Sequence, residues 1–398
     1  MHSDATALLC RSICVSGLML LPAAFASPNR AITVTVGETI EITSSKRTCW
    51  FPTIHRFSTG EILVTVRMSP DEVHPEGEFS AYCISADGGQ TWGQRYTMGA
   101  GGNVDAAYTQ VPPPDGTLLS LSGGYGSPVA YPPGQSQTFR VVVTTYSRGG
   151  MEFTQVRDAV LRLRAPVRLE PMKLFDLGTK DVSKLEMAPM VTPQGAIIDG
   201  LNGDLLATVY CTAEKDGRQL LLLARSKDRG KTWDECGMIA GLAVSEKPTS
   251  WMGDEGPNEA AIVRLADQRL YAVFRTGQDA FLGQSWSSDD GRTWSLPVST
   301  GLKGVAPHLR RLSSGVLVCT TGRPGPVTVL FNEDGRGGSW SHATELFRGK
   351  GTRYSDVIEA EPGKLLVVYD CVPYGWQPIP NSDKNAKNTI YGTFVGVQ

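Results

Sequence analysis

The 398-residue sequence predicts an all-β protein, a six-bladed β-propeller whose blades each hold four antiparallel strands. The first observation behind this prediction is a hairpin tip that occurs three times, as SADGGQTW at 85–92, SKDRGKTW at 226–233 and SSDDGRTW at 287–294. Asp accepts hydrogen bonds from the amides of its own turn, Gly adopts positive φ, and Thr-Trp restarts a strand. The repetition indicates a repeated architecture, and we expect the Asp side chains of these tips to be structural.

The second observation is a turn followed by a Leu-rich strand, which recurs along the chain. Its six copies are TGEIL at 59–63, DGTLL at 115–119, NGDLL at 202–206, DQRLY at 267–271, SGVLV at 314–318 and PGKLL at 362–366. Two hairpins per unit give four strands per unit, and the chain shows almost no helical periodicity. A β-sandwich is the alternative fold, but sandwiches do not repeat a marked hairpin so regularly.

The tips of the other units differ from the three clean copies. The fifth unit carries a stretched tip, NEDGRGGSW at 332–340, and the second carries TTYSRGGMEF at 144–153. The last unit lacks a second hairpin of its own. We therefore expect NTIYGTFVGV at 388–397 to pair with AITVTVGETIEI at 31–42, so that the two chain ends close the ring.

The N-terminus predicts export. Residues 1–26 contain Arg11, an apolar stretch from about Val15 and Ala-Phe-Ala at 24–26 as a cleavage site, which is typical of a secretory signal peptide. Residues 27–398 are then expected to form a single propeller, secreted or periplasmic and monomeric. No later segment is apolar enough to span a membrane. The net charge of −2 argues against nucleic acid or an anionic membrane surface as the main partner.

Six cysteines follow the predicted signal peptide: Cys49, Cys83, Cys211, Cys236, Cys319 and Cys371. An oxidising compartment permits pairing, and a bond between Cys211 and Cys236 would close a short loop; buried free thiols are the alternative. The cysteines have no metal-ligand spacing, and nothing in the sequence points to a metal or an organic cofactor.

The SxDxGxTW tip resembles the Asp-box of the sialidase (neuraminidase) superfamily, and the resemblance covers nearly all of the mature chain. It implies hydrolysis of terminal sialic acid, or of a related acidic sugar, with retention of configuration. The implied machinery is a Tyr nucleophile, a Glu that assists it, an Asp acid/base and three Arg that hold the substrate carboxylate. A neutral nucleophile does not repel an anionic sugar, and guanidinium groups bind carboxylates bidentately.

The segment NEAAIVRLADQRLYAVFRTG at 258–277 resembles the family segment with the assisting Glu and the second clamp Arg, which here are Glu259 and Arg275. The spacing supports this pair independently. The hairpin turns near Asp267, eight residues after Glu259 and eight before Arg275, so we expect the two side chains to form a cross-strand ion pair. An ordinary salt bridge at the rim is the alternative interpretation.

Two later segments complete the resemblance. GTRYSDVIEAEPGKLLVVYD at 351–370 places the nucleophile on Tyr354, and TTGRPGPVTVLFNEDG at 320–335 places the third clamp Arg on Arg323. Arg323 lies between turns rich in Gly and Pro, which suits a ligand contact made from a loop. For Tyr354 the alternative is a structural Tyr with a satisfied hydroxyl.

The first unit departs from the family pattern. Trp50 stands where the resemblance expects the first clamp Arg, so Arg47, Arg56 or Arg67 would have to substitute. We list Trp50 as a candidate substrate contact because it occupies this motif position.

The acid/base is expected in the loop RMSPDEVHPEGEF at 67–79, where Asp71 is closest to the family in residue type and Glu72 in spacing. His74 is a separate candidate in the same loop, because the ordinary pKa of His suits proton transfer near neutrality. A solvated acidic loop is the alternative interpretation.

Two further candidates lie outside the family template. SWMGDEGPNE at 250–259 places Asp254 and Glu255 just ahead of Glu259, and crowded carboxylates can raise one another's pKa and so provide an acid. His308 begins the hairpin of the fifth unit, on the side expected to face the axis; a structural His is the alternative.

Two other functions fit the same sequence. A propeller polysaccharide lyase, or another glycosidase, would act on uronic-acid or neutral sugars with His or Tyr in the chemical step. A non-catalytic propeller would bind glycans or proteins without turnover. The Trp at position 50 favours both of these alternatives.

Overall fold

The computed structural model describes residues 31–68, 79–97, 106–110, 118–122, 137–146, 153–164, 169–171, 187–189, 191–213, 217–241, 251–375 and 377–398. Every regular element in these ranges is a β-strand. The same ranges hold no helix long and apolar enough to cross a membrane. The all-β prediction is confirmed for this part of the chain. The predicted signal peptide lies outside it.

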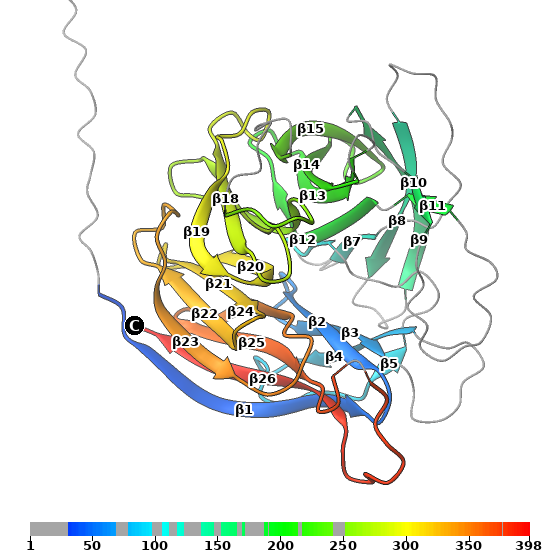
Figure 1. Cartoon of the computed structure of the whole chain (residues 1–398), viewed down its shortest axis with the longest axis vertical. Coiled ribbons are helices and arrows are strands. Elements are labelled where there is room, and N and C mark those ends of the chain that lie inside the picture. The colour runs from blue at the N-terminus through cyan, green and yellow to red at the C-terminus, as the bar shows by residue number, and fades with distance from the viewer. Residues whose placement is uncertain are drawn as a thin grey trace, which may run out of the picture.

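Four separate sheets each contain four antiparallel strands, and three of these sheets are formed by consecutive strands (Figure 1). The first is β2 (Cys49–Arg56), β3 (Ile62–Met68), β4 (Phe79–Ser85) and β5 (Tyr96–Thr97). The second is β16 (Asn258–Arg264), β17 (Leu270–Arg275), β18 (Phe281–Ser287) and β19 (Val298–Lys303). The third is β20 (Val305–Arg311), β21 (Leu317–Gly322), β22 (Val327–Asn332) and β23 (Ser341–Phe347).

The fourth sheet joins the two ends of the chain. Its order is β1 (Val34–Ser45), β26 (Asn388–Val397), β25 (Lys364–Cys371) and β24 (Ser355–Glu361). Strand β1 pairs antiparallel with β26, from Val34 opposite Val397 to Ser45 opposite Asn388, and Figure 1 shows the blue first strand beside the red last one. The predicted pairing of the chain ends is therefore confirmed.

The remaining long strands form one closed eight-stranded arrangement. It contains two antiparallel runs of four, which are β6 (Ala106–Tyr108), β7 (Leu118–Ser122), β8 (Gln137–Tyr146) and β9 (Phe153–Leu163), and β12 (Val191–Asp199), β13 (Leu205–Thr212), β14 (Gln219–Ser226) and β15 (Thr232–Ala240). Parallel pairing of β6 with β12 and of β9 with β15 joins the two runs. A two-stranded sheet, β10 (Leu169–Pro171) with β11 (Met187–Pro189), completes the fold.

The apolar core lies in layers between neighbouring sheets. Ile54 and Val64 of one sheet pack with Leu366 and Val368 of the next, in one of six such clusters. The first strand of each run or sheet contacts the first strand of its neighbour, through β6, β12, β16, β20, β24 and β2. These six strands are the innermost ones. All six line one of the two cavities described below, and β2, β12, β16 and β20 also line the other.

The Asp tips are structural, as predicted. In the tip between β4 and β5, Asp87 Oδ1 accepts the amide of Thr91 at 2.9 Å, and Ser85 Oγ accepts the amide of Gly89 at 2.8 Å. Asp228 and Asp289 accept equivalent bonds in their own tips. Hydrogen bonds from Thr91 hold the pKa of Asp87 at about 2, below its usual range.

All six described cysteines are free thiols, and Cys49, Cys83, Cys211 and Cys319 are buried. The bond considered between Cys211 and Cys236 is not formed. Burial raises the pKa of the Cys211 thiol to about 12, as expected for a small apolar core residue.

Candidate active site

Four innermost strands are bulged at a residue with positive φ. Phe51 in β2 (φ 53°), Glu259 in β16 (φ 34°) and Ala306 in β20 (φ 42°) are non-glycine residues in this region, and Gly195 in β12 has φ 80°. Each lies within a register shift against the next strand. A bulge leaves one residue unpaired and redirects its side chain, so the ladder opens here.

The bulge at Glu259 brings three charged or polar side chains together. The Tyr354 hydroxyl donates a hydrogen bond to Glu259 Oε1. Arg275 donates from Nη1 to the same Oε1 at 2.9 Å, and its Nη1 lies 3.4 Å from the Tyr354 hydroxyl. The other carboxylate oxygen of Glu259 accepts the amide of Ala306 at 3.0 Å. The predicted ion pair between Glu259 and Arg275 is thus present, and it contacts the predicted nucleophile.

The environment of Tyr354 keeps its hydroxyl protonated. Burial raises the pKa of Tyr354 well above its usual value, and the negative charge of Glu259 raises it further, whereas Arg275 opposes the increase. The phenol could therefore act as a nucleophile only if a base in contact took its proton, and Glu259 is the carboxylate in contact with it.

Two guanidinium groups flank the Tyr354 ring. The Arg323 guanidinium lies 5.5 Å from the ring centroid. The Nε atoms of Arg275 and Arg323 are buried and have no hydrogen-bond acceptor among the described residues. The rings of Phe51 and Tyr354 pack edge to face, with centroids 4.9 Å apart.

A buried carboxylate fixes the loop that carries Tyr354. Asp370, at the end of β25, accepts the amide of Thr352 at 2.8 Å and the amide of Phe51 at 3.1 Å. It thereby ties the Tyr354 loop to the bulge of β2. Burial raises the pKa of Asp370 to about 6, against the lowering effect of these hydrogen bonds.

Tyr354 and Glu259 open onto a cavity of about 230 Å³, here called the upper cavity. Phe51, Arg67 and His308 contribute to its wall. The other lining residues are Pro52, Thr53, Thr65, Val66, Thr192, Pro193, Gln194 and Tyr210, which include several hydroxyl and amide side chains. The cavity is therefore polar as well as charged, and it fits a small polyhydroxylated ligand.

The comparisons with known proteins can now be set beside this geometry. Residues 177–367 match the BNR repeat-like domain family. The structure of a protein of unknown function from Dyadobacter fermentans is similar with a TM-score of 0.65 at 21% identity, covering 92% of this chain and 99% of that one. No curated protein sequence matches the chain.

Two glycosidases of known structure share the fold. An α-L-arabinanase from Penicillium chrysogenum, complexed with arabinobiose, has a TM-score of 0.58 at 16% identity, over 90% of this chain and 98% of that one. The NanB sialidase from Streptococcus pneumoniae, as its K499G mutant, has a TM-score of 0.57 at 13% identity, over 89% of this chain and 70% of that one.

The chain is therefore similar to BNR repeat-like domains over residues 177–367, and it shares its fold with a sialidase. At these identities the likeness to the solved structures establishes the fold, whereas the chemistry depends on the side chains of this protein.

Some predicted residues do not reach the upper cavity. Trp50 is buried, with 5% of its surface exposed, and the neighbouring Phe51 lines the cavity instead. Of the three arginines considered as substitutes for the missing clamp residue, Arg67 lines the upper cavity. Arg56 lines the cavity at the other end of the innermost strands, and Arg47 does not line either cavity.

The acidic segment ahead of Glu259 contributes Glu255, in a role that the sequence analysis did not predict. Asp254 is exposed, and it does not line the upper cavity. Glu255 instead accepts a hydrogen bond from Arg275 Nη2 at 2.9 Å. Arg275 is therefore held by two carboxylates. Asp71 and His74, the candidates for the acid, lie outside the described residues.

His308 reaches the upper cavity, as predicted for a residue on the axial side. Its Nδ1 lies 2.9 Å from Oδ1 of Asp356 in β24, although the approach is oblique to the N–H direction. Asp356 also accepts the amide of Ile54 at 3.1 Å and Arg310 Nη2 at 3.1 Å. His308 and Arg310 hold the pKa of the Asp356 carboxyl well below its usual range despite burial, which raises it.

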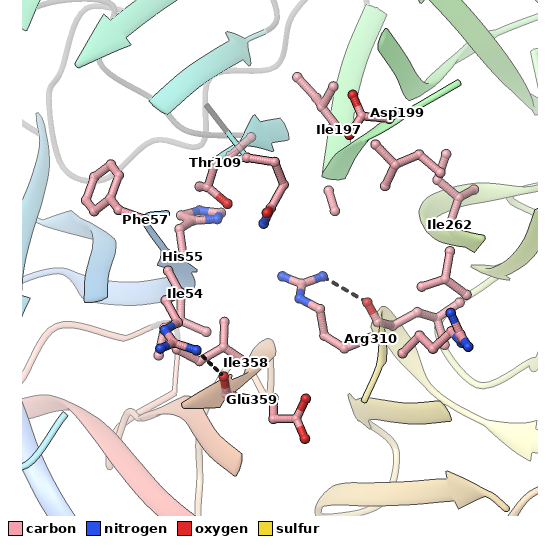
Figure 2. A pocket seen from close by; sticks show the side chains of 18 of the residues that line it. Ile54, His55, Phe57, Thr109, Ile197, Asp199, Ile262, Arg310, Ile358 and Glu359 are labelled. Atoms are coloured by element: carbon pink, nitrogen blue, oxygen red, sulfur yellow. Dashed lines mark hydrogen bonds between the residues drawn. The ribbon is translucent and has the colours of Figure 1, made fainter. Parts of the chain in front are cut away.

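The opposite ends of the same innermost strands line a second space of about 520 Å³, the lower cavity. Figure 2 shows Arg310 reaching into its centre, with His55 on the β2 side. Burial lowers the pKa of His55 to about 4, while Asp356 opposes the decrease. Within the described ranges, neither cavity holds a group of three His, Cys, Asp or Glu side chains placed to bind a metal ion.

Proposed function

We propose that the protein is a retaining exo-glycosidase that removes terminal sialic acid, or a related acidic sugar, from glycans. The observation that carries this proposal is the contact of the Tyr354 hydroxyl with Glu259, with Arg275 touching both, at the wall of the upper cavity. A Tyr bonded to a carboxylate and flanked by cations has the groups needed for nucleophilic attack on an anionic sugar.

In the first step, Tyr354 Oη bonds to the anomeric carbon while the glycosidic C–O bond breaks. Glu259 takes the phenol proton, and an acid protonates the leaving oxygen. In the second step, water attacks the anomeric carbon, the bond to Tyr354 breaks, and Glu259 returns the proton to the phenol. Asp71 is proposed as the acid and then the base, because it stands in the loop that follows β3.

The positive groups have two roles in this scheme. Arg275 lies beside Glu259 and Tyr354, where it stabilises negative charge that develops on the phenol oxygen. Arg323 and Arg275 both carry a buried Nε–H without an acceptor among the described residues, so a substrate carboxylate can supply one if the side chains adjust on binding.

We also propose that the two antiparallel runs β6–β9 and β12–β15 are two separate blades, which gives six blades with the four separate sheets.

The remaining part of the proposal is that the protein is an exported, monomeric enzyme with a glycan substrate. Edman sequencing of protein secreted by an expressing cell should begin at residue 27, and retention of residues 1–26 would contradict export by signal-peptide cleavage.

A second candidate substrate is a neutral sugar. Glu255 and Glu259 together neutralise Arg275, and the aromatic Phe51 stands beside the position where the family resemblance places a clamp Arg. These features lower the positive charge of the upper cavity relative to a site with three free arginines, and they favour a glycosidase acting on neutral sugars such as arabinofuranosides.

The test is turnover of two fluorogenic substrates, a sialoside and an α-L-arabinofuranoside, by the wild type and by Tyr354→Phe. We expect Tyr354→Phe to reduce kcat at least about 10³-fold, because the nucleophile is removed. Tyr374→Phe is the control, since Tyr374 also donates to a carboxylate, Asp383, but outside the cavity.

Each outcome points to one function. Release of sialic acid supports the leading proposal, and release of arabinose supports the second. Inert wild-type protein on both substrates would overturn both proposals. Unsaturated products from a uronate polymer would then favour a lyase, and glycan binding without turnover would favour a binding protein.

A further inference from the structure

The wall between the two cavities holds a buried group of charged side chains that the proposed mechanism does not use. Asp356 lies at its centre and is 1% exposed. It is contacted by His308 and Arg310 from β20, and by the amide of Ile54 from β2. His55, also from β2, is close enough for the negative charge of Asp356 to affect its pKa. A buried carboxylate with this many donors stays ionised and rigid.

The ring of His308 contacts this group, and the residue also lines the upper cavity. Its Nδ1 is the atom next to Asp356, at 2.9 Å, while the residue itself lines the cavity beside Tyr354 and Glu259. The Nε2 edge lies on the opposite side of the imidazole from Nδ1. An ionised carboxylate next to Nδ1 favours the proton on that nitrogen, even with an oblique contact.

We propose that His308 binds the substrate through Nε2 and that Asp356 is the positioning residue that fixes its ring. The ligand group is a hydroxyl of the sugar bound beside Tyr354, and Nε2 accepts its hydrogen bond when the ring is neutral. This inference rests on the proposed function, since it names a contact to the same sugar.

The surroundings of His308 support recognition of a polyhydroxylated ring. Thr53, Thr65, Thr192, Gln194 and Tyr210 line the same cavity. The hydroxyls of Thr53 and Thr65 hydrogen-bond to each other at 2.6 Å, and either oxygen can be the donor. The charged groups around His308 are Asp356 from β24, Arg310 from its own strand, His55 from β2 and Glu259 from β16.

Two substitutions separate the nitrogens of His308. His308→Asn keeps an amide near the Nδ1 position and loses the group at Nε2, whereas His308→Gln keeps an amide near Nε2 and loses the donor to Asp356. We expect His308→Asn to raise KM about tenfold with a smaller change in kcat, and His308→Gln to retain more of the affinity. The control is His342→Asn, because His342 lies 3.1 Å from Glu333 in a partly exposed pair outside the cavity.

Spectroscopy of the resting protein tests the positioning role without a substrate. In ¹⁵N-histidine-labelled protein, the His308 resonances, assigned by their loss in His308→Asn, should report a proton on Nδ1. Asp356→Asn should abolish this preference. A neutral ring with its proton on Nε2 in the wild type would overturn the role of Asp356.

Failure of the proposed His308 contact can be distinguished from failure of the proposed function. If the wild type turns over a substrate but His308→Asn and the control behave alike, the contact is wrong while the function stands. If the wild type is inert, addition of free N-acetylneuraminic acid or L-arabinose at millimolar concentration decides the contact. A shift of the His308 Nε2 resonance supports it, and unchanged resonances overturn it.

Discussion

The two ends of the innermost strands use charge in different ways. At the upper cavity, Tyr354, Glu259 and Arg275 bond mainly to one another. At the lower cavity, two charged groups, Glu359 and Arg56, bond to the main chain. Glu359 accepts the amides of Ser313 and Gly363, and Arg56 donates to the carbonyl of Glu359.

This difference separates candidate functional groups from structural ones. A side chain bonded to the backbone has a partner that cannot leave without breaking the fold. A side chain bonded to other side chains can exchange a partner for a ligand, because rotamer changes suffice. The bulges of β2, β16 and β20 create the second situation at the upper end, since they remove backbone partners from the ladder.

The largest expected effect is on kcat, when one carboxylate at the upper end and one at the lower end are each replaced by an amide in separate variants. Glu259→Gln should lower kcat about 10²- to 10⁴-fold, because the amide cannot accept the Tyr354 proton. Glu359→Gln should leave kcat within about twofold, since its carboxylate serves only the main chain and Ser313. Steady-state kinetics on the substrate that the wild type hydrolyses measure both. Equal losses in the two variants would remove the distinction between the ends.

A smaller effect is expected for stability at the lower end. The folded pKa of His55 is about 4, below the ordinary 6.5, so the unfolded chain binds more protons between these values. The contribution of His55 is complete above pH 6.5 and is lost as the pH falls through the window, about 3 kcal/mol in all. In urea unfolding between pH 7.5 and 4, His55→Gln should lack this loss. Parallel curves for the two proteins would contradict the prediction.

At the upper end, the pH dependence of the free energy of unfolding should have the opposite sign. The folded pKa of Asp370 is about 6, above the ordinary 3.8, so the folded protein binds more protons between these values. Its contribution is complete below pH 3.8 and is lost as the pH rises to about 6, again roughly 3 kcal/mol. Asp370→Asn should remove this dependence from the unfolding curve. If the variant instead becomes more pH-dependent than the wild type, the carboxyl is ionised throughout.

The smallest effect concerns the second carboxylate on Arg275. Glu255→Gln removes a charge that competes with a substrate carboxylate for Nη2, so KM for an anionic substrate should fall about 3- to 10-fold. Asp279→Asn, an exposed charge in the loop after β17, is the matched control. The same fall in KM for a neutral arabinofuranoside would show that Glu255 acts on the shape of the site and not on its charge.

Much of the fold could be predicted because its signals are local. Asp, Gly and Trp at fixed spacings mark the hairpin tips. The same short motifs predict where the strand after each tip begins. The closure of β1 on β26 followed from counting strands. The parallel pairing of β6 with β12 could not be predicted, because it depends on how the two four-stranded runs pack together. No turn motif in the sequence specifies that pairing.

Spacing alone predicted a contact of the candidate site only where one hairpin contains both partners, whereas the family resemblance identified Tyr354. Equal spacing about Asp267 identified Glu259 and Arg275, but the pairing register is different. Arg275 lies opposite Asn258, and Glu259 is the bulged residue. The roles of Asp370, Asp356 and Glu255 were missed. Asp370 reaches the amide of Phe51 across 319 positions of sequence, and Asp356 lies 48 positions from His308, so no short-range pattern indicates either contact.

The place of β26 between β1 and β25 determines when the sheet beside Tyr354 can be completed. Tyr354 immediately precedes β24, the innermost strand of that sheet, and the sheet needs residues 34–45 as well as residues 388–397. A nascent chain cannot supply β26 until residues 388–397 have left the ribosome. The surroundings of Tyr354 are therefore completed only after every described site residue has been translated, and a product terminated before residue 388 would lack the strand that joins β1 to β25.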